Sequence, residues 1–302
     1  MISNGKFYES QFEEATIELR EAHWQYAFGD DIHRKYTDPL IEEDLRNFLT
    51  VQYKDKNLTT SEMDSIVANL RNTGGQNDYY ALRNAFLLYR DGYDFAYSDG
   101  RDNPFRLEYI DFEHPDHNIF RCVNQFVMEQ GRENRRPDIL LFINGIPVCI
   151  IELKNPTKQN ATIHDAHTQI CTRYMRDIPA LLKYCALAVI SDGAKNALGT
   201  TYTPFEFFYE WKKIENEDKA GKGLDTLRTL IRGALSPERI LEILRDYVYF
   251  PDPTKEDDTT EIVCRYPQFF ATRKLRDHIL NHLRSVGGDG KGGTYFGATG
   301  CG

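Results

Sequence analysis

The stretch RPDILLFINGIPVCIIELK, residues 136–154, decides the fold. Two apolar runs are joined by an Asn-Gly pair at 144–145, which is the strongest short-range signal for a β-hairpin. Asp138 comes just before the first run, whereas Glu152 and Lys154 end the second. Charged residues at these places are either an ordinary ion pair at the end of a strand or a group held there for chemistry.

The length of the hairpin loop decides which side chains share a face of the sheet, because side chains alternate along a strand. A two-residue loop would turn Glu152 away from Asp138. A three-residue loop over 143–145, or a β-bulge of equal effect, pairs Asp138 with Ile150 and gathers Asp138, Glu152 and Lys154 on one face. We predict this second arrangement.

Two carboxylates and a lysine on one face have a specific chemical use. Carboxylate oxygens are ligands that Mg²⁺ prefers, so Asp138 and Glu152, with the Leu153 carbonyl, are candidate metal ligands. A metal there would polarise a phosphodiester and lower the pKa of a bound water. Lys154 would orient that water or stabilise the charge that develops on the phosphate. The Pro-Asp pair ahead of the hairpin favours this interpretation over an ion pair with no further role.

The composition indicates a folded chain. Its 302 residues are enough for one large domain or two small ones, and 41% apolar and 13% aromatic residues supply a core. A net charge of −9 argues against a protein that coats nucleic acid through bulk charge, but it leaves room for a local basic groove.

The cysteines and the N-terminus indicate the compartment. None of the six cysteines forms a CxxC pair and several lie in apolar runs, so we expect reduced core thiols. The N-terminus has no signal-peptide pattern, and no run of about 18 apolar residues is present to span a bilayer. The sequence predicts a cytoplasmic protein that does not contact a membrane.

Three histidine pairs raise the question of a zinc site. They lie at 114/117, 164/167 and 278/282, and no Glu or Cys accompanies them at zinc-site spacing. We therefore expect no zinc site.

Periodicity predicts that the chain contains both strands and helices, as an α/β fold does. Strand patterns cover residues 105–112, 118–129, 139–143, 146–153 and 185–193. Helical patterns cover residues 10–27, two stretches within 39–72, 77–92, 162–183, most of 203–247, and 270–285. An acidic, proline-bearing segment begins near 251 and is typical of a linker, so we divide the chain into 1–250 and 251–302.

The Pro-Asp…Glu-Leu-Lys arrangement resembles the PD-(D/E)xK nuclease motif. Its wider context resembles the N-terminal nuclease domain of the R (restriction and motor) subunit of type I restriction-modification enzymes. The resemblance covers most of residues 8–250 and implies an α/β fold with a mixed sheet, in which flanking helices surround a restriction-endonuclease-like core. The segments that carry it are NQF (124–126), RPDILLFINGIPVCIIELKNPT (136–157), HTQICTRYMRDIPALLKYCALAVISDG (167–193) and GTTYTPFEFFYEW (199–211).

This resemblance implies a role for each matching residue. Asp138 and Glu152 match the metal ligands of the family, and Lys154 matches its catalytic lysine. Gln169 and Tyr174 resemble the Gln…Tyr motif of RecB-like nucleases, although four residues separate them here where the motif has three. Their role would be to support the site or to contact DNA.

Two further assignments stay open. Glu13 or Glu14 matches the extra acid that some of these nucleases carry, or lies on a solvated helix face. For Arg173 and Arg176, the alternatives are contact with DNA phosphates and exposure to solvent without a partner.

The C-terminal residues resemble the start of a motor domain. GATGCG, residues 297–302, supplies the first six positions of a G-x-x-x-x-G-K-[ST] P-loop, with Gly297, Gly300 and Gly302 among them. Gln268 resembles the adenine-reading glutamine of superfamily 2 helicase-like motors. We expect a nuclease domain cut from a longer chain inside the nucleotide loop of a RecA-like motor. ATP would be a cofactor of the full-length protein, since this chain lacks the P-loop lysine and hydroxyl.

The resemblance implies a Mg²⁺-dependent endonuclease that cuts double-stranded DNA through backbone contacts, without sequence specificity of its own. In the family, the parent enzyme works with methyltransferase and specificity subunits and translocates DNA with ATP before it cleaves. Two alternatives stay open: a free-standing RecB-like nuclease, and a non-catalytic DNA-binding or assembly module of the same fold. The partial P-loop argues against the first, and the intact set of two carboxylates and a lysine argues against the second.

Overall fold

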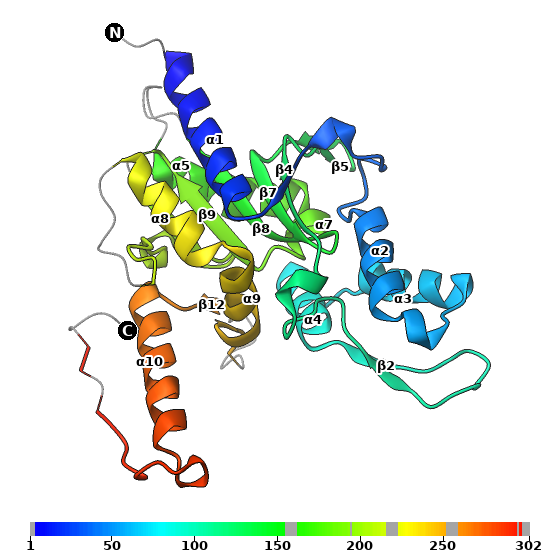
Figure 1. The fold of residues 1–302 in the computed structure, drawn as a ribbon. Helices are drawn as coiled ribbons and strands as arrows, with labels where there is room; N and C mark the ends of the chain where they lie inside the picture. Colours follow the sequence, from blue (N-terminus) through cyan, green and yellow to red (C-terminus); the bar gives the residue numbers. More distant parts are fainter. Residues whose placement is uncertain are drawn as a thin grey trace.

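A six-stranded mixed β-sheet forms the centre of the protein, in the order β1-β4-β7-β8-β9-β10 (Figure 1). The computed structural model describes residues 4–154, 162–193, 195–215, 223–251, 259–294 and 296–297. The pairs β1–β4 and β8–β9 are parallel, and the other three pairs are antiparallel. The predicted α/β fold with a mixed sheet is confirmed. The six strands are β1 (Gln25–Phe28), β4 (Phe120–Asn124), β7 (Ile139–Ile143), β8 (Ile146–Leu153), β9 (Leu187–Ser191) and β10 (Asn196–Gly199).

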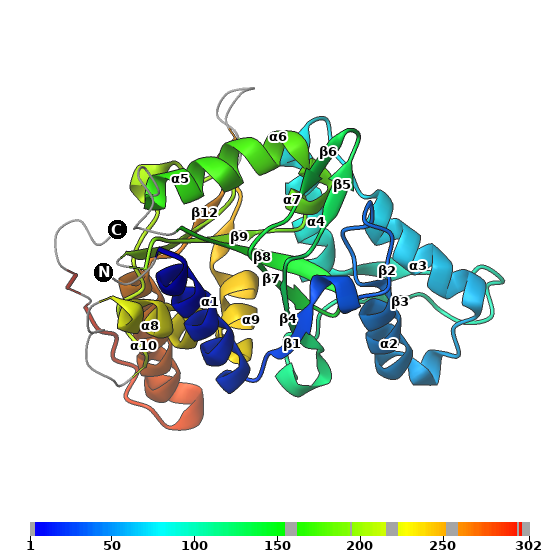
Figure 2. The ribbon, with the colours of Figure 1, turned by 90° about the horizontal axis from the view of Figure 1, so that it is seen from above.

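Helices cover both faces of this sheet, which is why the central strands β7 and β8 are buried along their whole length (Figure 2). One face, which carries Leu140 and Ile150, packs against α5 (Ile163–Thr168), a π-helical turn (Gln169–Tyr174), α6 (Met175–Asp177) and α7 (Pro179–Leu182). The opposite face, which carries Leu141 and Ile151, packs against α1 (Asn4–Glu21), α8 (Leu224–Ala234) and α9 (Pro237–Asp246).

A second group of helices lies beside the sheet (Figure 1). It contains α2 (Glu42–Gln52), α3 (Thr60–Asn72), α4 (Asp78–Asp91) and the ribbon β2–β3 (Tyr93–Phe95 and Phe105–Leu107). A further ribbon, β5–β6 (Met128–Gln130 and Glu133–Arg135), follows β4. The short pair β11–β12 (Val248–Tyr249 and Ile262–Val263) leads into α10 (Tyr266–His282), which projects from the body in Figure 1. Phe269 at the start of α10 is fully buried in the same core as α8 and α9, and the domain division near residue 250 stays a prediction.

Three stretches differ from the predicted secondary structure. Residues 25–27 belong to β1, because they pair in parallel with β4 rather than continue the first helix. The first part of 203–247 is largely non-helical, because Tyr209 forms a β-bridge with Leu198 of β10. Only the first three residues of 105–112 form a strand, because the Asp111 side chain accepts two backbone N–H groups and turns the chain.

The thiols and the helices agree with two simpler predictions. Five cysteines are free, and Cys122, Cys149 and Cys185 are fully buried, while Cys301 lies outside the described residues. Among the helices of the described chain, none combines the length and the apolar character that a bilayer crossing requires.

The β7–β8 hairpin differs from prediction in its loop but not in its faces. Asn144 and Gly145 both have positive φ, 50° and 76°, and form a two-residue turn, so the predicted three-residue loop is wrong. A register shift beyond Leu141 then acts as the alternative bulge: Leu141 pairs with Cys149 and Ile139 with Ile151. One step further, Asp138 comes beside Glu152 rather than beside Ile150. The two carboxylates therefore share a face, as predicted.

The Asn144 side chain ties this turn to the segment between β3 and β4. It is fully buried, accepts the Ile119 N–H at 2.7 Å, and donates to the Tyr109 carbonyl at 3.0 Å and to Asn118 Oδ1 at 2.8 Å. Gly145 closes the turn, and its carbonyl accepts the Ile41 N–H at 2.9 Å. The hairpin is thereby held by polar contacts at its tip as well as by its apolar faces.

Two turn glycines provide a matched test of this anchoring. A Cβ added at Gly145 would lie 2.1 Å from the Ile41 carbonyl, whereas one added at Gly131, in the β5–β6 turn with a similar φ of 63°, meets nothing within 4 Å. We expect Gly131→Ala to lower the free energy of unfolding by about 1 kcal/mol through backbone strain alone. Gly145→Ala should cost at least about 2 kcal/mol because overpacking is added. Urea denaturation measures both, and equal losses would contradict the close packing at the tip.

Candidate active site

Asp138 and Glu152 are two buried carboxylates on one face of the sheet. Asp138 precedes β7 and is 8% exposed, and Glu152 lies near the end of β8 and is 2% exposed. The Leu153 N–H donates to Asp138 Oδ2 at 2.8 Å, which fixes the Asp138 side chain at the end of β8. Buried carboxylates are costly unless they are paired or bind a cation, so this pair requires a physical explanation.

The protonation of Glu152 reflects this confinement. Burial first, and then the negative charge of Asp138, raise the pKa of the Glu152 carboxyl to about 8. Lys154 acts in the opposite direction, because its Nζ lies 2.9 Å from Glu152 Oε1. A carboxyl poised near neutral pH beside a lysine is typical of a functional site rather than of an inert ion pair.

Gln169 and Tyr174 complete the cluster from the helix that covers this face. Gln169 accepts from Lys154 Nζ at 2.5 Å through Oε1, and its Nε2 donates to Glu152 Oε1 and to the Tyr174 hydroxyl. Tyr174 lies 3.4 Å from Glu152 Oε2 and its pKa is raised, mainly by burial. The structure thus brings Glu152, Lys154, Gln169 and Tyr174 into one hydrogen-bonded group.

A π-helical turn explains how both residues reach the cluster. An α-helix brings residues four apart onto one side, but Gln169 and Tyr174 are five apart. The helix takes the π form over Gln169–Tyr174, which accommodates one extra residue per turn. The irregular spacing, noted in the sequence as a departure from the motif, is the signal that could have predicted this turn.

The remaining predicted residues lie outside this group. Arg173 is exposed on the same turn, and Arg176 is exposed and paired with Asp177 at 2.6 Å. Glu13 is exposed on α1 and Glu14 is half-buried there. Neither is hydrogen-bonded to the two carboxylates in the described part of the chain, so the open alternatives for the acids and the arginines stay open.

The donor set suits a hard divalent cation. Two carboxylates from adjacent strands offer the oxygen ligands that Mg²⁺ prefers, and both are buried on one face. The Lys154 ammonium group supplies a positive charge 2.9 Å from Glu152 Oε1. The backbone of Leu153 is tied to Asp138 through its N–H, and the predicted role of its carbonyl as a ligand stays a prediction.

Gln268, predicted from the sequence to read adenine, lies near the start of α10. The Gln268 side chain accepts the Arg265 N–H at 2.8 Å and so begins α10. It also lines a cavity of about 610 Å³ together with Tyr209, Glu261 and Arg265. Gly297 is exposed, and Gly300 and Gly302 lie outside the described residues.

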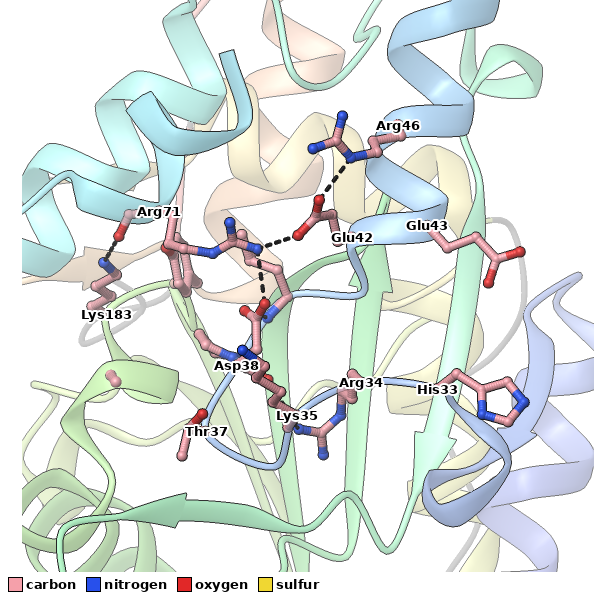
Figure 3. A pocket seen from close by; sticks show the side chains of 14 residues that line it. His33, Arg34, Lys35, Thr37, Asp38, Glu42, Glu43, Arg46, Arg71 and Lys183 are labelled. Atoms are coloured by element: carbon pink, nitrogen blue, oxygen red, sulfur yellow. Dashed lines mark hydrogen bonds and ion pairs between the residues drawn. The ribbon is translucent and has the colours of Figure 1, made fainter. Parts of the chain in front are cut away.

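A larger cavity of about 860 Å³ lies between the 33–46 segment, Arg71 and α7 (Figure 3). Ion pairs link several of its side chains: Arg71 contacts Asp38 at 2.8 Å and Glu42 at 2.5 Å, and Arg46 contacts Glu42 at 2.7 Å. Lys183 donates to the Arg71 carbonyl at 2.7 Å. These cations already have partners, so the cavity is a salt-bridged junction between α2, α3 and α7 rather than an anion site.

Several type I restriction enzyme endonuclease subunits are similar to this chain in sequence. The HindI endonuclease subunit of a type I restriction enzyme from Haemophilus influenzae is 27% identical over 285 residues, which cover 90% of this chain and 27% of that protein. A Methanocaldococcus jannaschii protein whose name is that of the MjaIXP endonuclease subunit of a type I restriction enzyme is 27% identical, over 90% of this chain and 28% of that protein. The EcoprrI endonuclease subunit of Escherichia coli is 27% identical over 64% of this chain and 59% of its own.

The chain therefore spans little more than a quarter of the length of the first two relatives. The family described as the N terminus of the type I restriction enzyme R protein matches residues 6–207, well over half of the chain. The chain therefore belongs to the family of type I restriction enzyme R proteins and corresponds to their N-terminal region.

Proposed function

We propose that this chain is the Mg²⁺-dependent endonuclease domain of a type I restriction enzyme R subunit, and that it cleaves phosphodiester bonds of DNA without sequence specificity of its own. The observation that supports this most is the convergence of Asp138, Glu152 and Lys154 on one buried face. Asp138 and Glu152 would hold the metal, which supplies charge stabilisation and an activated water when bound. The whole enzyme would add ATP-driven translocation and the methyltransferase and specificity subunits.

The chain's own residues would then perform distinct tasks. Gln169 accepts a hydrogen bond from the Lys154 ammonium group at 2.5 Å, which restrains the lysine beside Glu152. Lys154, whose ammonium group contacts both Glu152 and Gln169, would stabilise the charge that develops on the phosphate. Tyr174 and Gln169 keep the Glu152 carboxylate oriented through hydrogen bonds.

The two alternative functions differ from this one in what they require of the site. A non-catalytic DNA-binding or assembly module does not need a buried carboxyl with a pKa near neutrality, which costs stability. A free-standing RecB-like nuclease would share the site but not the family. The match over residues 6–207 favours the R subunit.

Metal binding is the first prediction. We expect Mg²⁺ or Mn²⁺ to bind the wild-type chain, and Asp138→Ala and Glu152→Ala each to weaken that binding by at least about 100-fold, because each removes a ligand. Glu206→Ala, which removes an exposed acid elsewhere, should bind as wild type does. Isothermal titration calorimetry measures all four proteins.

The same titration on Glu13→Ala separates the two roles left open for that residue. Weakened binding would assign Glu13 to the site, and wild-type binding would assign it to a solvated face. If Asp138→Ala and Glu152→Ala both bound the metal as wild type does, the carboxylates would be only an ion pair at a strand end.

A pH dependence is the second prediction. Since the pKa of Glu152 is raised to about 8, the carboxyl is largely protonated below that pH, and metal must displace the proton. We expect the dissociation constant for Mg²⁺ to rise about tenfold for each pH unit below 8, and to level off above it. Calorimetry at pH 7 in buffers of different ionisation enthalpy should show proton release on binding.

Lys154→Met tests the cause of this shift. Lys154 lowers the pKa of Glu152, so its removal should move the midpoint of the pH dependence upward. A midpoint that stays at the same pH would show that Lys154 does not contact Glu152 in solution.

A further inference from the structure

A second group of potential metal ligands is linked to the tip of the β7–β8 hairpin, whereas the carboxylate pair lies at the other end of that hairpin. Asp111, His114 and His117 bring one carboxylate oxygen and two imidazole nitrogens within 4.8 Å of one another. His117 Nδ1 lies 2.8 Å and His114 Nδ1 3.3 Å from the same Asp111 Oδ2 atom. The prediction of no zinc site was based on the lack of Glu or Cys at zinc-site spacing from the histidine pairs. In the structure, the third potential ligand is Asp111.

The carboxylate of this group is rigidly positioned. Asp111 is 4% exposed, and its Oδ1 accepts the N–H groups of Glu113 at 3.0 Å and His114 at 2.9 Å. Gln52 of α2 donates to Oδ2 at 3.2 Å. Hydrogen bonds that orient a ligand in this way are a usual feature of protein metal sites.

The backbone of Asp111 is fixed as well. Asn118 accepts the Asp111 N–H at 2.9 Å and donates to its carbonyl at 2.7 Å, and Asn144 of the hairpin turn donates to Asn118. The group therefore connects α2, the loop around the 3₁₀ helix Pro115–His117 and the tip of β7–β8.

The histidines are arranged for a shared cation. Their rings stack at 4.8 Å with an interplanar angle of 21°, and both direct Nδ1 at one oxygen. The pair at 164/167 has the same spacing in sequence, but its rings are 6.2 Å apart and His167 contacts the Thr203 carbonyl. Convergence on one carboxylate thus distinguishes His114 and His117 from a pair with equal spacing.

We propose that Asp111, His114 and His117 form a site for Zn²⁺ or a similar transition-metal ion, which clips the 109–119 segment to the hairpin tip and α2. Zinc bonds of about 2.0–2.2 Å in a tetrahedral arrangement place ligand atoms about 3.3 Å apart. The two separations between Asp111 Oδ2 and the Nδ1 atoms, 2.8 and 3.3 Å, are close to this value, and all three ligand atoms lie within 4.8 Å of one another. Imidazole ligands select such ions over Mg²⁺, and the exposed side of the histidines leaves a fourth position for water.

The test uses Zn²⁺ as the probe on the whole chain, in the presence of saturating Mg²⁺. His114→Ala/His117→Ala should lose Zn²⁺ affinity by at least about 100-fold relative to wild type, whereas the matched variant His164→Ala/His167→Ala should keep it. Calorimetry measures the affinity, and the visible absorption of bound Co²⁺ reports the geometry. Because His114 and His117 are 66% and 53% exposed, their removal should leave the fold intact, which near-UV circular dichroism verifies.

Two results would overturn the proposal: no Zn²⁺ binding to wild type, or binding that is unchanged in His114→Ala/His117→Ala. Asp111→Asn keeps an oxygen for the two backbone N–H groups but removes the charge, so it should also weaken Zn²⁺ binding. Glu152→Gln removes a carboxylate of the nuclease site and should leave Zn²⁺ binding unchanged. A failure of the zinc site and a failure of the proposed nuclease function are therefore separate outcomes.

Discussion

The confinement of Glu152 beside Asp138 is the constraint on which the rest of the site depends. Two carboxylates without water repel each other and resist ionisation, which is why the pKa of Glu152 is raised to about 8. Hydrogen-bond donors surround the two carboxylates. Glu152 accepts from Lys154, which directly follows β8, and from Gln169 and Tyr174 of the covering helix, and Asp138 accepts from the Leu153 N–H. Helix, strand and loop are thus fixed relative to one another by the need to satisfy one pair.

The hairpin supplies the geometry that this pairing needs. A two-residue turn alone would have directed the two carboxylates to opposite faces. The register shift after Leu141 returns the two carboxylates to the same face. The buried Asn144 side chain fixes the turn, which stabilises this register. The contacts at the tip of the hairpin therefore stabilise the register that places Asp138 beside Glu152 at its other end.

Sequence patterns predicted the parts of this structure that short-range chemistry controls. The bounds of β7 and β8, the shared face of Asp138 and Glu152, and the helices α2–α4 followed from apolar periodicity and turn residues. The exact turn did not, because a bulge and a longer loop give the same parity. β1 was mistaken for helix, because its strand character comes from parallel pairing with a segment almost a hundred residues away. The contact of His114 and His117 with Asp111 also depends on a loop whose shape the pattern does not encode.

The π-helical turn affects how this helix can accommodate a change in its number of residues. A single added residue normally rotates everything beyond it by about 100°, and every downstream contact would be lost. Here the extra residue is absorbed within one turn, so Gln169 and Tyr174 keep their partners and Ile170 and Ile178 keep their places in the core. The π-helical turn therefore lets the helix hold one more residue while the same side chains continue to face the sheet.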